Sequence, residues 1–104
     1  PPPGLEINPD AATVTVGGQV LDPPLSPHQF TLLALLVENA GRIVTREQIV
    51  EAIWGPDETV ADQTLDALVS RLRKRLQDAD PAHDYLVTRR GFGLMFQNRT
   101  QSVY

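Results

Sequence analysis

The chain has 104 residues, of which 41% are hydrophobic and 21% charged, and this fits a single globular domain. It contains no cysteine, which excludes disulfide bonds and thiolate metal sites, and no apolar run approaches the ~20 residues of a membrane span. We therefore expect a cytoplasmic domain that does not contact a membrane, and the proline-rich residues 1–4 predict a linker in front of it.

The formal net charge of −4 argues against a nucleic-acid partner, but the charge is unevenly distributed. Residues 1–61 carry two arginines and eight carboxylates, a net charge of −6, whereas residues 62–104 carry seven basic groups and five carboxylates, a net charge of +2. Four of the nine basic residues lie between Arg71 and Arg75. Because charges are screened over about 8 Å at physiological salt, a ligand responds mainly to this local cluster.

The chain begins with two predicted strands, residues 5–7 and 13–16, which alternate or are β-branched. Gly17 and Gly18 then precede a third short apolar run, residues 19–21. Two glycines between such runs indicate a two-residue hairpin turn, since they tolerate the positive φ that this turn requires. We expect a small antiparallel sheet here.

The first helix is predicted from its start signal. Ser26 is the expected N-cap, Pro27 suits the first turn, and Gln29 completes a capping box. Residues 30–40 are apolar almost all round, which indicates a central buried helix. Gly41 is the expected C′ residue that ends it.

The second helix repeats this pattern, with Thr45 as N-cap and Gln48 closing the box. Gly55 and Pro56 end it. Only residues 42–44 separate Gly41, at the end of the first helix, from Thr45, the cap of the second. The chain is therefore expected to turn sharply between the two helices. A polar loop, residues 55–61, follows.

The third helix is predicted at about residues 62–76, from apolar residues that form one stripe at helical spacing. The stripe comprises Leu65, Leu68, Val69, Leu72 and Leu76. The side opposite the stripe holds Gln63, Ala67, Ser70 and Lys74. Arg71 and Arg73 flank that outer side, while Arg75 lies closer to the stripe and is expected to be structural.

The chain closes with two predicted strands, residues 85–88 and 94–96, joined by a basic tip at residues 89–93. Gly91 and Gly93 suit a tight turn whatever the function. A basic hairpin tip fits the minor groove of DNA, where the potential is most negative. This favours DNA contact by Arg90 and leaves Arg89 open, since the two alternate in direction along a strand. Residues 98–104 are expected to form a tail.

The sequence offers no catalytic or metal-binding constellation. His28 and His83 are isolated from other ligand residues, so both are expected to be structural or solvated. Ser26 and Thr45 are helix caps without a histidine placed to activate them. Trp54 is expected in the core. We therefore expect no enzyme activity, no cofactor and no metal.

In this order and spacing, the motifs resemble the DNA-binding effector domains of OmpR/PhoB-family bacterial response regulators. The resemblance spans about residues 5–96. It rests on residues 25–30, Leu32, Leu33, residues 39–48, Trp54, Gly55, residues 64–66, residues 70–76 and residues 88–93. It implies an α+β winged helix-turn-helix fold, with an N-terminal antiparallel sheet, three helices and a C-terminal β-hairpin wing, which would place the domain at residues 5–97.

The resemblance also implies sequence-specific binding of double-stranded DNA in bacterial transcription. The helix at about residues 62–76 would lie in the major groove, and the wing, residues 89–93, in the minor groove. By position, Arg71 would read bases, Arg73 and Lys74 would contact phosphates, and Arg90 would be the wing arginine. The full set of implied DNA-binding residues is Thr64, Asp66, Ser70, Arg71, Arg73, Lys74 and Arg90.

Three further partners are expected. The resemblance implies that the loop at residues 55–61 contacts RNA polymerase and that a receiver or sensor domain precedes the chain. So few basic contacts should bind weakly in a single copy, which favours a homodimer on tandem half-sites.

Some positions depart from the family's usual residues. Gln63 and Ser70 replace frequent basic side chains, Leu68 replaces a frequent histidine, and Leu94 follows Gly93 where the family often has tyrosine. With the acidic net charge, these departures keep a second interpretation open. In that alternative the domain is a winged-helix protein-interaction module with weakened or lost DNA binding.

Overall fold

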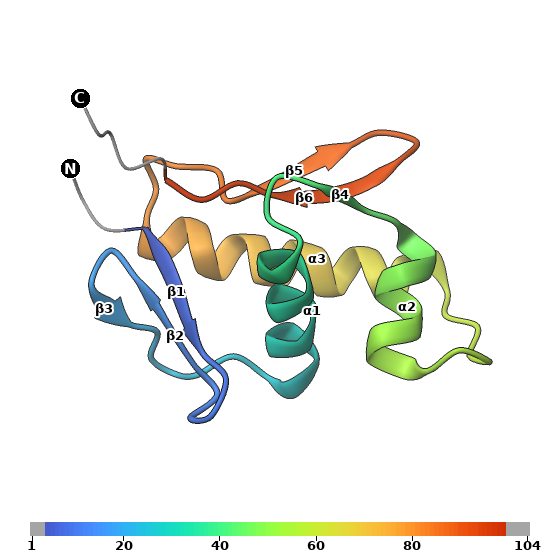
Figure 1. The fold of residues 1–104 in the computed structure, drawn as a ribbon, viewed down its shortest axis with the longest axis horizontal. Helices are drawn as coiled ribbons and strands as arrows, with labels where there is room; N and C mark the ends of the chain where they lie inside the picture. The colour runs from blue at the N-terminus through green and yellow to red at the C-terminus, as the bar shows by residue number, and fades with distance from the viewer. Residues whose placement is uncertain (1–3, 100–104) are drawn as a thin grey trace.

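The computed structural model of the protein describes residues 4–99, which fold into two small antiparallel sheets around three helices (Figure 1). The predicted α+β winged-helix architecture is confirmed. In chain order the elements are β1 (Leu5–Asn8), β2 (Thr13–Val16), β3 (Gln19–Val20), α1 (Pro27–Glu38), β4 (Ile43–Val44), α2 (Arg46–Trp54), α3 (Asp62–Ala79), β5 (Leu86–Arg89) and β6 (Gly93–Phe96).

The N-terminal sheet has the strand order β1-β2-β3. Gly17 and Gly18 both have positive φ, 61° and 86°, which confirms the two-residue turn between β2 and β3. Leu5, Val14 and Val16 are buried, so the sheet contributes one face to the core.

Both capping boxes are present. The Ser26 hydroxyl accepts from the Gln29 N–H, and the Gln29 side chain accepts from the Ser26 N–H. Thr45 and Gln48 make the same reciprocal pair at the start of α2. These bonds satisfy orphan donors at each helix start, and they fix where α1 and α2 begin.

The expected end of α1 was wrong. The helix stops at Glu38 with Asn39 as its C-cap, so Gly41 is not the C′ residue. Gly41 instead takes a positive φ of 80° in the following turn, and its N–H donates to the Phe96 carbonyl at 3.0 Å. Gly41 therefore makes a hydrogen bond to the C-terminal sheet and does not cap α1.

The sequence analysis did not predict the strand that lies between α1 and α2. β4 pairs with β6 in antiparallel register, Ile43 opposite Met95 and Val44 opposite Leu94. The C-terminal sheet therefore has three strands in the order β4-β6-β5 instead of a two-stranded hairpin. A strand of two residues is too short to show an alternating pattern in the sequence. Its partner, β6, follows α3 in the chain, so no local signal indicates the pairing.

The third helix is longer than expected and ends at Ala79. Asp78 continues the helix, and the break comes at Asp80 because the following proline disfavours helical geometry in the preceding residue. The apolar stripe is confirmed: Leu65, Leu72 and Leu76 are buried. Leu68 and Val69 are partly buried against the same core.

The hairpin tip is tighter than expected. β5 reaches Arg89, which pairs with Gly93 at the start of β6, so only residues 90–92 form the turn. Tyr85 lies just before β5 rather than in it, and its ring is buried. The hairpin formed by β5, the tip and β6 is the wing.

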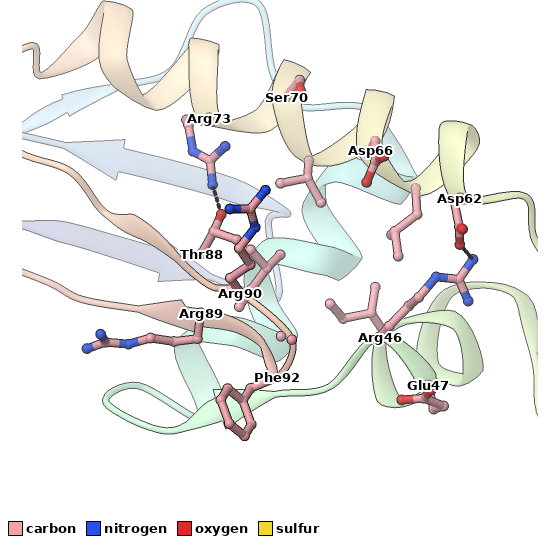
Figure 2. Close-up of a pocket in the computed structure, with 16 residues that line it drawn as sticks. Arg46, Glu47, Asp62, Asp66, Ser70, Arg73, Thr88, Arg89, Arg90 and Phe92 are labelled. Atoms are coloured by element: carbon pink, nitrogen blue, oxygen red, sulfur yellow. Dashed lines mark hydrogen bonds and ion pairs between the residues drawn. The ribbon is translucent and has the colours of Figure 1, made fainter.

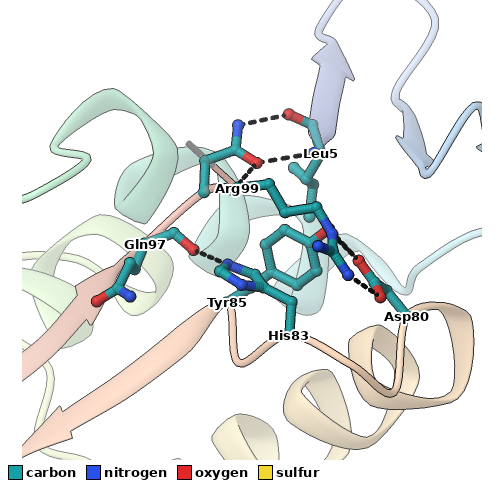
Figure 3. Close-up of polar contacts among 7 residues, drawn as sticks. Leu5, Asp80, His83, Tyr85, Gln97 and Arg99 are labelled. Carbon is teal, nitrogen blue, oxygen red and sulfur yellow. Dashed lines mark hydrogen bonds and ion pairs between the residues drawn. The ribbon is translucent and has the colours of Figure 1, made fainter. Parts of the chain in front are cut away.

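Residues on either side of the expected domain limits are bonded to the fold. The Gly4 carbonyl accepts from the Gly17 N–H at 3.2 Å. The Asn98 side chain pairs with both backbone groups of Leu5, at 2.9 and 3.0 Å (Figure 3). The rest of the expected linker and tail, residues 1–3 and 100–104, lies outside the described residues.

A polar cluster at Asp80, Tyr85 and Arg99 joins the end of α3 to the end of the C-terminal sheet (Figure 3). Arg99 donates to both Asp80 oxygens at 2.7 Å, and the Tyr85 hydroxyl donates to Asp80 at 2.6 Å. The hydrogen bonds from Arg99, and then from Tyr85, hold the pKa of the Asp80 carboxyl well below its usual value. Burial, and then the bond to Asp80, raises the pKa of Tyr85 to about 12.

Gly93 should be the glycine least tolerant of substitution. A Cβ at this position would lie 2.1 Å from the Val44 carbonyl oxygen, and the residue has a φ of 147°. We expect Gly93→Ala to lower the free energy of unfolding by more than about 2 kcal/mol in urea titrations.

The matched control is Gly91→Ala. Gly91 also has a positive φ, 84°, but no atom of residues 4–99 lies within 4 Å of the position that a Cβ would take. This substitution should cost only the backbone penalty, about 1–2 kcal/mol. Equal losses in the two variants would contradict the proposed backbone clash.

The polar cluster should make stability depend on pH at both extremes. Because the folded-state pKa of Asp80 is lowered, its contribution is present at neutral pH and is lost as pH falls through and below the ordinary carboxyl value of 3.8. Because the pKa of Tyr85 is raised, its contribution is complete below pH 10 and is lost as pH rises towards 12. Urea titrations across these ranges measure both losses.

Asp80→Asn should lower stability at pH 7 and should flatten the loss on the acid side, since this side chain no longer titrates. Asp78→Asn is the control, because among the described residues Asp78 makes only an exposed ion pair, with Lys74 at 3.5 Å. If Asp80→Asn retained the full acid-side loss of the unmodified chain, the assignment to Asp80 would be wrong.

Candidate nucleic-acid interface

A groove of about 820 Å³ lies between α3, the start of α2 and the wing (Figure 2). The helix contributes residues at successive turns of one side, and the wing contributes its whole tip. The lining consists of Arg46, Glu47, Ile49, Asp62, Leu65, Asp66, Val69, Ser70, Arg73 and residues 88–94.

Four of the seven expected site residues line this groove. Asp66, Ser70 and Arg73 do so from α3, and Arg90 does so from the wing tip. Asp66, Ser70 and Arg73 occur at spacings of three or four residues, so they share the wing-facing side of the helix. The groove therefore brings together helix and wing residues that are well separated in sequence.

The other three expected residues, Thr64, Arg71 and Lys74, are exposed on α3 outside the groove lining. At 100° per residue, Arg71 lies on the helix edge turned away from the wing, whereas Arg73 lies on the wing edge. Arg73 lines the groove and Arg71 does not, as expected for residues on opposite edges of the outer side. Arg71 makes no ion pair within residues 4–99, while Lys74 pairs weakly with Asp78.

A direct hydrogen bond joins α3 to the wing. Arg73 Nη2 donates to Thr88 Oγ1 at 2.8 Å, across a sequence separation of 15 residues (Figure 2). A guanidinium group has five N–H donors, and this hydrogen bond uses one of them. The remaining N–H groups of Arg73 can bind an anion. The contact places the Arg73 guanidinium within the groove lining, next to the wing.

Arg46 is a site residue that the sequence analysis missed. Its guanidinium forms an ion pair with Asp62 at 2.7 Å and donates to the Val60 carbonyl at 2.6 Å. It therefore ties the first turn of α2 to the end of the loop at residues 55–61 and to the first turn of α3. No local sequence pattern indicates this role for Arg46, because its partners lie outside α2, Val60 in the following loop and Asp62 in α3.

The groove carries charges of both signs. Glu47, Asp62 and Asp66 lie on its α2 and α3 sides, and the Arg46 ion pair offsets the charge of Asp62. The two wing arginines lie on the other side. Apart from Arg46, the cations of the groove are Arg73 and the two wing arginines, so they gather on its wing side.

The two wing arginines diverge. Figure 2 shows Arg90 directed towards α3 near Thr88, while Arg89 extends away from the helix. Both are exposed, and neither forms an ion pair in the part of the chain that the structure describes. Phe92, at the same tip, is 70% exposed.

The residues expected to be structural or solvated, His28, Trp54, Arg75 and His83, lie outside the groove lining. Trp54 is partly buried, with the His28 ring in an edge contact at a centroid distance of 5.3 Å. The Arg75 guanidinium donates to the Pro23 carbonyl, which anchors it to the segment before α1. His83 makes a hydrogen bond with the Gln97 carbonyl. No helix of the described chain is long and apolar enough to cross a membrane.

The chain matches known proteins over most of its length. The family model described as "transcriptional regulatory protein, C terminal" matches residues 21–96. The DNA-binding domain of CpxR from E. coli is 33% identical, with a TM-score of 0.74 and 89% of each chain covered. The RstA DNA-binding domain of Klebsiella pneumoniae, solved in complex with the RstA box, is 31% identical, with a TM-score of 0.75 and coverage of 89% and 90%.

A third similar structure is the Thermotoga maritima response regulator DrrB, described as an OmpR/PhoB homolog. It is 33% identical, with a TM-score of 0.74. The alignment covers 89% of the present chain but only 41% of DrrB. The present chain therefore corresponds to less than half of that protein.

Proposed function

The chain belongs to the OmpR/PhoB-type family of transcriptional regulatory C-terminal domains, which bind DNA in a sequence-specific manner, and we propose how its own residues divide that task. In this proposal α3 enters the major groove and the wing tip enters the adjacent minor groove. The comparisons favour this function over the protein-interaction alternative.

One observation carries the proposal. Asp66, Ser70 and Arg73 of α3 border a single groove with the wing tip, and the Arg73–Thr88 hydrogen bond joins its two walls. In duplex DNA a sugar–phosphate backbone separates the major groove from the neighbouring minor groove. A helix in one and a hairpin in the other would straddle that backbone, which would lie along the groove of this protein beside Arg73 and Arg90.

Arg71 is the proposed base-reading residue. It is exposed on the outer side of α3 without an ion pair in residues 4–99, so its guanidinium is available for bidentate contact with guanine. Arg73 and Lys74 would contact phosphates, as would the hydroxyls of Thr64 and Ser70. Arg90 would occupy the minor groove.

The exposed loop at residues 55–61 is the proposed contact for RNA polymerase. Most of its residues are exposed, yet Arg46 binds the carbonyl of Val60 and so fixes the end of the loop next to α3. Because the loop is fixed next to the start of α3, RNA polymerase could contact it while α3 is bound to DNA.

We also propose that the domain acts in the bacterial cytoplasm as part of a longer regulator. A receiver or another sensor domain would precede residue 1. With few cations on the interface, a single copy would bind weakly, so two copies on tandem half-sites would supply the affinity.

Substitution of Arg71 and substitution of Arg90 should each weaken DNA binding, but in different ways. Arg71→Ala should reduce the preference for a selected site over random duplex by about 1–3 kcal/mol, because a base contact is lost. Arg90→Ala should weaken both complexes and reduce the slope of log K against log salt by about 0.9. Fluorescence anisotropy across a salt series measures both quantities.

The control is Arg42→Ala. Arg42 is an exposed arginine in the turn after α1, near the end of β6 remote from the tip, so binding should be unchanged. The proposal fails if the unmodified chain shows no binding at tens of micromolar in low salt. It also fails if neither Arg71→Ala nor Arg90→Ala differs from Arg42→Ala.

Asp66 allows a test of base reading by a carboxylate. Its side chain lies in the groove lining, and a carboxylate can accept a hydrogen bond from the cytosine amino group. If it does so, Asp66→Asn should change the preferred base at one position of a selected site, as read by sequencing of bound DNA from a random pool. If Asp66 instead only repels phosphate, the variant should bind every sequence more tightly and show no shift in preference.

A further inference from the structure

Phe92 is the most exposed large apolar side chain described. It is 70% exposed, compared with 60% for Val20 and 43% for Ile43. It is the last residue of the wing turn, just before β6. Isolated exposed apolar residues are common in proteins, so exposure alone does not assign a role. Its position among cations is what distinguishes it.

The turn that carries Phe92 is closed and supported. The Phe92 N–H donates to the Arg89 carbonyl at 2.8 Å, and the next residue, Gly93, packs directly against the Val44 backbone. The phenyl ring is thus presented on a fixed backbone, which limits the ordering entropy that a contact must overcome.

The charges beside the ring indicate what it meets. Arg89 and Arg90 extend from the same tip, one away from α3 and one towards it (Figure 2). A partner that accepts both cations together with an apolar ring needs anionic groups next to carbon-rich surface. The minor groove of DNA provides both, since its walls are deoxyribose rings and its edges are phosphates.

We propose that Phe92 packs against the deoxyribose wall of the minor groove and supplies an apolar, salt-independent part of the DNA affinity. This inference rests on the proposed function, in which the wing tip occupies the minor groove. It assigns the tip two kinds of contact: a cationic one through Arg90 and an apolar one through Phe92.

The two contacts differ in how they respond to salt. An arginine that neutralises a phosphate releases condensed counterions, so its loss flattens the slope of log K against log salt by about 0.9. An apolar contact releases water but no ions. Loss of the ring should therefore shift the whole line to weaker binding without changing its slope.

The test measures this slope. The 104-residue chain first selects a duplex of about 30 base pairs from a random library, a length that accommodates two half-sites. Anisotropy titrations at several salt concentrations then compare the unmodified chain with Phe92→Ala, Phe92→Leu and Arg90→Ala. We expect Phe92→Ala to weaken binding roughly tenfold at every salt concentration, from partial burial of the ring. Phe92→Leu should recover most of the affinity.

Val20→Ala is the matched control, because Val20 is similarly exposed but lies on β3 of the N-terminal sheet. It should leave binding unchanged, and thermal unfolding should show that all variants are folded. Hydroxyl-radical footprinting adds a position-specific readout, since these radicals attack deoxyribose. Phe92→Ala should lose protection only at the sugars beneath the wing.

The possible results separate this inference from the proposed function. If the unmodified chain does not bind DNA, both are overturned. If it binds and Arg90→Ala behaves as expected, but Phe92→Ala binds equally well or shows a flattened salt slope, only the role of Phe92 is overturned. An equal loss of affinity in Val20→Ala would also overturn it.

Discussion

The backbone pairing of β4 with β6 is the constraint on which the interface depends. Ile43 and Val44 connect α1 to α2, and through Met95 and Leu94 they also hold the wing. Gly93 makes this possible, because only a residue without Cβ can approach the Val44 carbonyl so closely. The wing is thus attached to the frame of the first two helices, and the same frame carries α3 through a shared apolar core. The distance between helix and wing follows from this frame rather than from the loop that joins them.

On that frame, a few polar contacts arrange cations on an acidic domain. Arg73 is bonded across to Thr88, and Arg46 is paired with Asp62 at the first turn of α3. The first bond holds charge between helix and wing, while the second neutralises a carboxylate that would otherwise repel a phosphate. The net charge of −4 is therefore compatible with a local surface for DNA, since screening limits the reach of carboxylates elsewhere.

The elements that the sequence predicted well are those with local signals. The capping boxes at Ser26 and Thr45 placed the starts of α1 and α2, and the leucine period of α3 identified its buried side. β4 was missed because a two-residue strand acquires its identity only from a partner in another part of the chain. Arg46 was missed for the same reason, since nothing near it in sequence indicates Asp62 or Val60. The assignment of particular residues to DNA contacts came from family resemblance, and the structure adds their spatial grouping.

The pairing of Asn98 with Leu5 has a consequence for self-association. β1 is an edge strand, and the outward N–H and carbonyl of Leu5 would be free to accept a strand from another molecule. The Asn98 amide donates to one of these groups and accepts from the other, as a neighbouring peptide would. Gly4 leaves room for it, because a Cβ there would collide with the amide oxygen. The Asn98 side chain thus occupies the backbone groups at the start of this edge, where a strand from another molecule would otherwise begin to pair.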